Sequence, residues 1–218
     1  MSATDSSSAR FASEARKGRR RLYPVTAIYT TLAFAALGYG LSSRPAEAAL
    51  AYVLGLLSWT LLEYFLHRYV LHGAFPDGPG LKHLLHLAFD HLHIEHHKRP
   101  WDGSHINGTV KDSWFIVFPL LLGSLLLPPW SLTPFVAGLM HAGIMEEWVH
   151  HSVHYYDFDN LYFRYIKRHH MYHHSPKGQA RGYGLTSGFW DRVFGTSFPP
   201  EVRQRLYASL RRPRRSAT

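Results

Sequence analysis

The sequence contains no cysteine among its 218 residues. Disulfide bonds and thiolate metal ligands are therefore excluded, and cysteine usage gives no information about the redox compartment. Acidic residues are also scarce, with 15 Asp and Glu against 24 Lys and Arg, which gives a formal charge of +9. Histidine shows the opposite bias, because 17 histidines in a chain of this length far exceed ordinary usage.

Half of the basic residues lie in two short terminal segments. Six precede Leu22 and six follow Glu201: Arg10, Arg16, Lys17, Arg19, Arg20, Arg21, Arg203, Arg205, Arg211, Arg212, Arg214 and Arg215. A nucleic-acid-binding domain more often carries its basic residues on a folded face. Basic segments that flank apolar ones are typical of the cytoplasmic side of membrane proteins. The distribution therefore favours a membrane over a nucleic acid as the partner.

Four apolar segments predict an all-α integral membrane protein with about four transmembrane helices in two hairpins. The segments cover residues 24–41, 48–67, 114–127 and 134–144. The first is about long enough to span a bilayer, which takes roughly 20 helical residues. The last two are shorter and are separated by Pro128 and Pro129, so tilted spans and buried core helices remain alternatives to the hairpin. The expected domains are a disordered basic tail (1–22), a membrane domain (23–198) and a basic C-terminal tail (199–218).

Charge also predicts an orientation. The hairpin turns carry little charge, Arg44 and Glu47 in the first and none in 128–131, whereas both terminal segments are strongly basic. The positive-inside rule then places both termini in the cytoplasm. The histidine clusters fall on that same side, where they would form a helical cap.

Ten histidines in four clusters are the candidate metal ligands: His67, His72, His93, His96, His97, His150, His154, His170, His173 and His174. Positions i, i+3 and i+4 share one helix face, so each HxxHH triplet and the HxxxH pair should converge on one side. His67 and His72 are five residues apart, about 140° round an α-helix, and should not share a face. They are expected to flank a helix end or to reach different metals.

The residue types indicate a dinuclear metal site. Neutral imidazole suits Zn, Cu, Fe and Ni, and ten such ligands would saturate two ions. Nearby carboxylates could hydrogen-bond the ligand imidazoles and fix their tautomers. The candidates are Glu63, Asp90, Glu95, Glu146 and Glu147, of which Glu63 and Glu146 each precede a histidine by four residues. The other seven histidines are expected at the surface or in packing: His83, His86, His91, His105, His141, His151 and His169.

The order HxxxxH, HxxHH, HxxxH, HxxHH resembles the fatty acid hydroxylase superfamily of membrane-bound oxygenases. The resemblance covers residues 50–197. Its motifs are LHRYVLH at 66–72, HIEHHKRPWDG at 93–103, the histidine pair at 150 and 154, and HMYHH at 170–174, followed by YGLTSGFWDRVFGT at 183–196. The HHKRPWDG stretch is most similar to the fatty acid 2-hydroxylases.

This resemblance implies two membrane hairpins under a cytosolic cap that holds two metal ions. Iron is the expected metal, although the ligand set also accepts zinc. The implied reaction is O2-dependent hydroxylation of a lipid acyl chain, with no catalytic side chain beyond the metal ligands. Since some twenty residues precede the first span, the electron donor is expected to be a separate protein, cytochrome b5-like or ferredoxin-like.

Two alternatives remain at this stage. The stretch after Gly103 reads SHINGT and leaves the 2-hydroxylase pattern, so a carotenoid hydroxylase or a sterol desaturase could share the metal site. A histidine-rich membrane protein that binds or transports metal is the alternative of another class. Transporters usually place such ligands inside the spans, whereas these lie at helix ends. A soluble zinc hydrolase is disfavoured because the chain has no HExxH motif.

Overall fold

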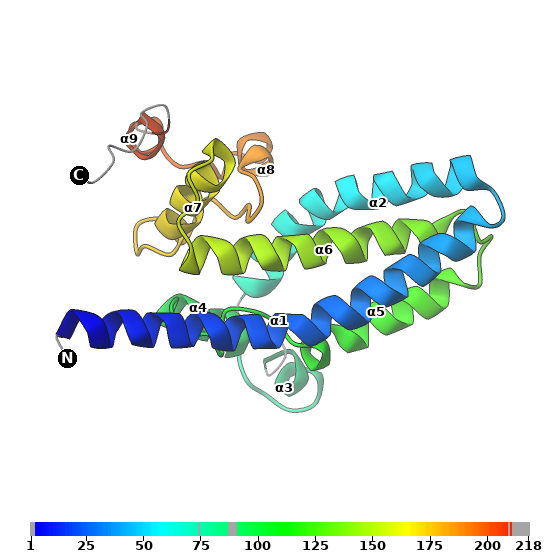
Figure 1. Ribbon diagram of the computed structural model, residues 1–218, viewed down its shortest axis with the longest axis horizontal. Helices are drawn as coiled ribbons and strands as arrows, with labels where there is room; N and C mark the ends of the chain where they lie inside the picture. The colour runs from blue at the N-terminus through cyan, green and yellow to red at the C-terminus, as the bar shows by residue number, and fades with distance from the viewer. Residues whose placement is uncertain (1–2, 74, 87–90, 209, 211–218) are drawn as a thin grey trace.

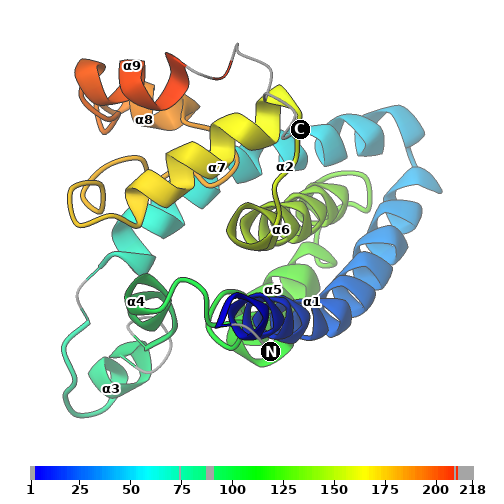
Figure 2. The same cartoon turned by 60° about the vertical axis from the view of Figure 1, so that its left-hand side comes forward.

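In the computed structural model, which describes residues 3–73, 75–86, 91–208 and 210, all regular secondary structure is helical, as predicted. Four helices form a long bundle (Figure 1): α1 (Ala3–Leu41), α2 (Pro45–Phe65), α5 (Val110–Ser124) and α6 (Leu132–Tyr155). The shorter helices gather around one half of this bundle (Figure 2): α3 (Leu81–Leu85), α4 (His91–Lys98), α7 (Leu161–His173), α8 (Phe189–Val193) and α9 (Pro200–Ala208). A short π-helical turn, η1 (Leu66–Leu71), continues α2.

Two helical stretches are long and apolar enough to cross a membrane, Ser7–Leu41 and Pro45–Leu71. Only 28% and 17% of their most apolar windows are buried in the protein, so most of the apolar side chains face outward. A helix in the core of a soluble protein would bury such a surface, whereas a lipid-facing helix exposes it. α5, with 15 residues, is about 22 Å long, less than the roughly 30 Å hydrocarbon core. The predicted number of four spans therefore stays a prediction.

The turns of the two hairpins lie together at the end of the bundle that is away from the short helices (Figure 1). The guanidinium of Arg44, in the α1–α2 turn, lies 4.4 Å from the centre of the Trp130 ring in the α5–α6 turn. This cation–π contact joins the two hairpins at their tips. Pro45 at the start of α2 has no N–H to leave unpaired, so it suits the first turn of the helix.

α6 is the central helix and packs between α1 and α2 (Figure 2). Its buried residues Val136, Ala137 and Met140 form one apolar cluster with Tyr29 and Ala33 of α1. The packing holds the C-terminal half of α6, which carries two of the candidate ligands, in a fixed position beside α7.

The N-terminal segment differs from the prediction of disorder over the residues that the structure describes. α1 begins at Ala3 and runs through the basic stretch without a break. Its first half is stabilised by contacts with the end of α6 and with the segment that follows α4. The ring of Phe11 lies 5.3 Å from that of Tyr155, Glu14 accepts a hydrogen bond from the Gly103 N–H at 3.0 Å, and Leu22 is buried. These tertiary contacts order a sequence whose composition alone suggests a solvated tail.

Candidate metal centre

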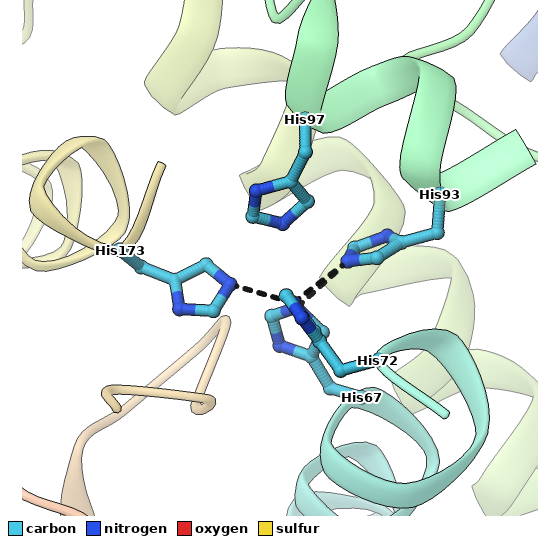
Figure 3. A group of neighbouring side chains, drawn as sticks. All are labelled: His67, His72, His93, His97 and His173. Carbon is cyan, nitrogen blue, oxygen red and sulfur yellow. Dashed lines mark hydrogen bonds between the residues drawn. The ribbon is translucent and has the colours of Figure 1, made fainter. Parts of the chain in front are cut away.

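The first histidine group comprises five residues, and one nitrogen from each lies within 4.8 Å of the others: His67, His72, His93, His97 and His173. Figure 3 shows the rings turned toward one another from η1 and the residue that ends it, from α4 and from α7. The Nε2 atom of His93 is 3.2 Å from that of His67 and 3.1 Å from that of His72. The Nε2 atoms of His72 and His173 are 3.0 Å apart.

The second histidine group has the same form: His96, His150, His154, His170 and His174. Nε2 of His150 lies 3.0 Å from that of His96, and Nε2 of His170 lies 2.9 Å from that of His154 and 3.0 Å from that of His174. The two groups together contain all ten histidines that the sequence pattern picked out.

Each HxxHH triplet is divided between the two groups, so the prediction that a triplet converges on one side is wrong. In α4, His93 and His97 join the first group and His96 joins the second. At the end of α7, His170 and His174 (the residue after the helix) join the second group, and His173 joins the first. Each helix position is rotated by about 100° from the one before it. Viewed down the helix axis, the second and third histidines of a triplet therefore lie on either side of the first, about 100° apart. Each triplet therefore bridges both groups.

His67 and His72 lie in the same group, which corrects the prediction that they cannot share a face. The N–H of His72 donates to the carbonyl of His67, five residues back, at 3.0 Å. This bond defines the π turn η1. The backbone of a π turn is wound more widely than an α-helix, so residues five positions apart come to lie on nearly the same side. The 140° offset assumed an α-helix that the backbone does not form here.

The donor set of each group fits a metal ion. Two ligand atoms at right angles, each about 2.1 Å from an ion, are about 3.0 Å apart. The Nε2 separations of 2.9–3.2 Å match that value. Burial lowers the pKa of His97 and of His173 to about 3, so both imidazoles are neutral and offer lone pairs near pH 7. An all-nitrogen set suits iron, zinc, copper or nickel.

Two members of the first group are oriented by backbone carbonyls. Nδ1 of His67 donates to the carbonyl oxygen of Tyr183, and Nδ1 of His173 donates to that of Arg181 at 2.8 Å. A carbonyl can only accept, so each proton resides on Nδ1 and the Nε2 lone pair faces the group. Sequence patterns missed these partners because every residue carries a carbonyl, and no side-chain type marks the one that is used.

Glu63 does not hydrogen-bond His67, although it precedes it by one helical turn. Its carboxylate is 3% exposed and accepts hydrogen bonds from the N–H groups of Leu185 and Thr186 and from the Thr186 hydroxyl. The residue thus faces the loop that supplies the Tyr183 carbonyl. Its contact with the metal centre is indirect.

The other predicted carboxylates have different surroundings. Glu95 lies at the surface and pairs with Lys98 and Arg99, at 3.0 and 2.8 Å. Glu147 accepts from the Asn107 amide at 2.7 Å. Glu146 is buried in α6, and Asp90 lies outside the described residues. Among the described residues, no hydrogen bond joins Glu95, Glu146 or Glu147 to either histidine group.

Six of the seven histidines that were predicted to be bystanders have described side chains, and all six lie outside both groups: His83, His86, His105, His141, His151 and His169. The structure does not describe the side chain of His91. His83 forms a surface pair with Asp77 at 2.7 Å, and His141 contacts the Tyr52 hydroxyl at 2.9 Å.

A cavity of about 320 Å³ opens beside the first group. Its wall includes His72, His93 and His97, and apolar surface from Leu71 and Ile94. A molecule in this cavity would meet three members of the first group directly. The cavity lining includes no member of the second group.

Comparison with known proteins assigns the family. The family model described as fatty acid hydroxylase matches residues 52–196, which is more than half of the chain. The chain belongs to the fatty acid hydroxylase family. The matched range includes both histidine groups and the loop that follows α7.

Curated relatives of this chain have similar names. A dihydroceramide fatty acyl 2-hydroxylase of Arabidopsis thaliana is 32% identical over 151 residues, covering 69% of this chain and 61% of the relative. A fatty acid 2-hydroxylase of Rattus norvegicus is 32% identical, covering 69% and 40%. A ceramide very long chain fatty acid hydroxylase of Schizosaccharomyces pombe is 31% identical, covering 74% and 46%. The chain thus spans about 40 to 61% of the length of these relatives.

A solved structure is also similar to this chain. The visible hydroxylase domain of full-length scs7p matches with a TM-score of 0.71 and 26% sequence identity. The match covers 83% of this chain and 67% of that one.

Proposed function

We propose that this chain is a membrane-bound hydroxylase of fatty acyl chains that uses two metal ions, O2 and electrons from a separate donor protein. The pair of five-histidine groups carries the proposal, because each gathers neutral imidazole nitrogens at the separations that one ion requires. Membership of the fatty acid hydroxylase family supports the reaction class.

The ten grouped histidines are the proposed metal ligands, five to each ion. Iron is the proposed native metal, and zinc would fit the same nitrogen ligands. When bound, iron supplies the one-electron and O2 chemistry that no protein side chain offers. The protein contributes binding and orientation of the ligands, with Tyr183 and Arg181 carbonyls holding the tautomers of two of them.

The reaction replaces one C–H bond by C–OH. One oxygen atom of O2 enters the product and the other leaves as water, which consumes two electrons and two protons. The cavity beside the first group gives an acyl chain access to His72, His93 and His97. Leu71 and Ile94 offer apolar contact to its methylenes.

The proposed substrate is a long acyl chain hydroxylated at its second carbon. The names of the relatives support this choice over a carotenoid or a sterol, since they specify fatty acyl 2-hydroxylation or ceramide acyl hydroxylation. The acyl chain would be free or amide-linked, as in a ceramide. Hydroxylation is proposed over desaturation on the same grounds.

Both termini and the histidine groups are proposed to face the cytoplasm. The basic residues near the ends of the chain support this orientation. Because the chain has no cysteine, single cysteines introduced at Ser43, in the α1–α2 turn, and at Ser175, beyond α7, report sidedness without background. A membrane-impermeant maleimide applied to intact cells should label Ser43→Cys and spare Ser175→Cys. The reverse pattern would contradict the orientation.

Metal content and lipid products test the function together. The purified chain, loaded with iron, should hold two equivalents of metal, and cells that express it should accumulate acyl chains with one added oxygen. His96→Ala and His173→Ala should abolish the product while membrane insertion persists, and the surface variant His83→Ala serves as the matched control. No more than one equivalent after loading, or metal flux into vesicles without an oxygenated lipid, would overturn the proposal.

A further inference from the structure

The loop at residues 181–186, which we call the anchor loop, supplies both carbonyls that orient histidines of the first group. Arg181 provides the acceptor for His173, and Tyr183 provides the acceptor for His67. The loop follows α7 and crosses to the end of α2, so it links two elements that are more than 100 residues apart in the chain. Any displacement of the loop would turn both imidazoles.

A buried carboxylate holds the middle of the anchor loop. Asp191 is 0% exposed and accepts hydrogen bonds from the N–H groups of Tyr183 and Gly184, at 2.9 and 3.0 Å. The Thr196 hydroxyl donates to it at 2.7 Å. A Cβ on Gly184 would lie 1.8 Å from the Ser187 carbonyl oxygen, so the close turn of the loop around Asp191 requires glycine there.

A second buried carboxylate holds the end of the anchor loop. Glu63, from α2, accepts from the next two N–H groups along the chain, those of Leu185 and Thr186, and from the Thr186 hydroxyl at 2.7 Å. Four consecutive N–H groups of the anchor loop thus donate hydrogen bonds to two carboxylates. Hydrogen bonds are directional, so these contacts restrict the orientation of the loop backbone.

The second histidine group has no comparable support. Nδ1 is buried without a hydrogen-bond partner among the described residues in four of its five members: His96, His154, His170 and His174. The carbonyl anchors in the described part of the chain therefore serve the first group, which is also the group beside the cavity.

We infer that Glu63 and Asp191 are positioning residues for the first histidine group alone: through the anchor loop they fix the orientation and the tautomer of His67 and His173. The inference rests on the proposed function, in that both groups bind metal. Removing either carboxylate weakens metal binding in the first group and leaves the second group unchanged. Loss of a hydrogen-bonding partner of a metal-bound histidine typically costs 10–100-fold in affinity.

The test measures metal affinity of the purified full-length chain, with zinc as the probe and a competing chelator at graded concentration. Glu63→Gln and Asp191→Asn keep the size of the side chain and remove its charge. Each should release one of the two equivalents at about tenfold lower chelator concentration, and retain the other as wild type does. Glu147→Gln is the matched control, because this partly buried carboxylate on α6 accepts a hydrogen bond from Asn107 and has no hydrogen bond to the anchor loop.

A double-mutant cycle identifies the group that is affected. In a His150→Ala background, which disables the second group, Glu63→Gln should still weaken the remaining equivalent about tenfold. In a His67→Ala background it should have no effect on the remaining equivalent. If Glu63→Gln fails to fold, Thr186→Val replaces it in the test, because this variant removes only the hydroxyl contact with Glu63. It should weaken metal binding in the first group by a smaller factor.

The outcomes separate the inference from the function on which it rests. Equal weakening of both equivalents, or wild-type affinity in Glu63→Gln and Asp191→Asn, would overturn the inference and leave the proposed function intact. A wild-type chain that binds no zinc or iron would overturn both.

Discussion

Gly55 of α2 and Gly138 of α6 face each other where the two helices cross, with their backbones in contact. A Cβ on Gly138 would lie 2.2 Å from the carbonyl oxygen of Tyr52, and one on Gly55 would lie 2.1 Å from that of Phe135. Small residues at a crossing let membrane helices approach this closely. The crossing fixes α2, which continues into η1, relative to α6, and so it helps to set the distance between the two histidine groups.

Gly138→Val should force α2 and α6 apart. Over-packing of a tight contact typically lowers the free energy of unfolding by about 1–3 kcal/mol. Backbone atoms lie on both sides of the Gly55–Gly138 contact, so the neighbouring groups have little room to move away. Unfolding in detergent micelles, followed by circular dichroism, measures the loss. Gly38→Ala and Gly123→Ala are the controls, since both positions are helical and have open space around the added methyl group. They should be neutral or more stable by about 0.4–1 kcal/mol.

The helical start of α1 should resist protease despite its basic sequence. Trypsin cleaves extended segments, and residues 16–21 are held in a helix that packs on the segment after α4. Gly103→Val should expose residues 16–21 to trypsin, because a Cβ at position 103 would lie 2.1 Å from the Glu14 carbonyl oxygen and push α1 away. Gly108→Ala, in ordinary contact with its neighbours, should stay protected. Rapid cleavage of the wild-type chain at these sites would restore the prediction of a disordered tail.

The metal-free protein should lose stability as the pH falls below about 6.5. The pKa of His97 and of His173 is about 3 in the folded chain, because of burial, against an ordinary value near 6.5. The unfolded chain therefore binds protons first, and each such histidine costs about 1.4 kcal/mol per pH unit between these two values. Micelle unfolding of the chelated protein from pH 7.5 to 5 measures the slope. His173→Gln should make it shallower, and a flat profile would contradict the argument.

Metal removal should loosen α4 and α7 more than the bundle. Each triplet bridges both groups, so bound ions would tie α4 to α7 and to the ends of α2 and α6. Hydrogen exchange with and without a chelator should show faster exchange in His91–Lys98 and Leu161–His173 on chelation. The crossing of α2 and α6 provides the internal reference and should exchange slowly in both states. Uniform acceleration over the whole chain would show instead that the ions support the entire fold.

Local pattern in the sequence was enough to pick out the ten histidines that the fold gathers, because residue type and spacing are local properties. The division of these histidines between two groups could not be predicted in this way, since it depends on the side of α4 that faces η1 and the side that faces α6. Glu63 illustrates the same limit. Its spacing predicted a contact with His67, but its hydrogen-bond partners are Leu185 and Thr186, 122 and 123 residues away in sequence. A local sequence pattern cannot predict partners at that separation.

The order of the N-terminal segment was also beyond local reasoning. Its composition is that of a solvated chain, and its helix is stabilised by Tyr155 and Gly103, which belong to distant segments. The helical class and the two hairpins, by contrast, follow from apolar runs broken at Arg44 and at Pro128, which are features of the sequence itself.

The π turn at η1 makes the number of residues between His67 and His72 matter more than their identity. Substitutions at Arg68, Tyr69 or Val70 leave the backbone bond between the two histidines in place. A single-residue insertion there should move His72 to another side of the turn and carry its ring out of the group. A deletion would leave the two histidines four residues apart, a spacing that keeps them on one face only if the π turn becomes α-helical. The spacing of five residues and the π turn therefore depend on each other.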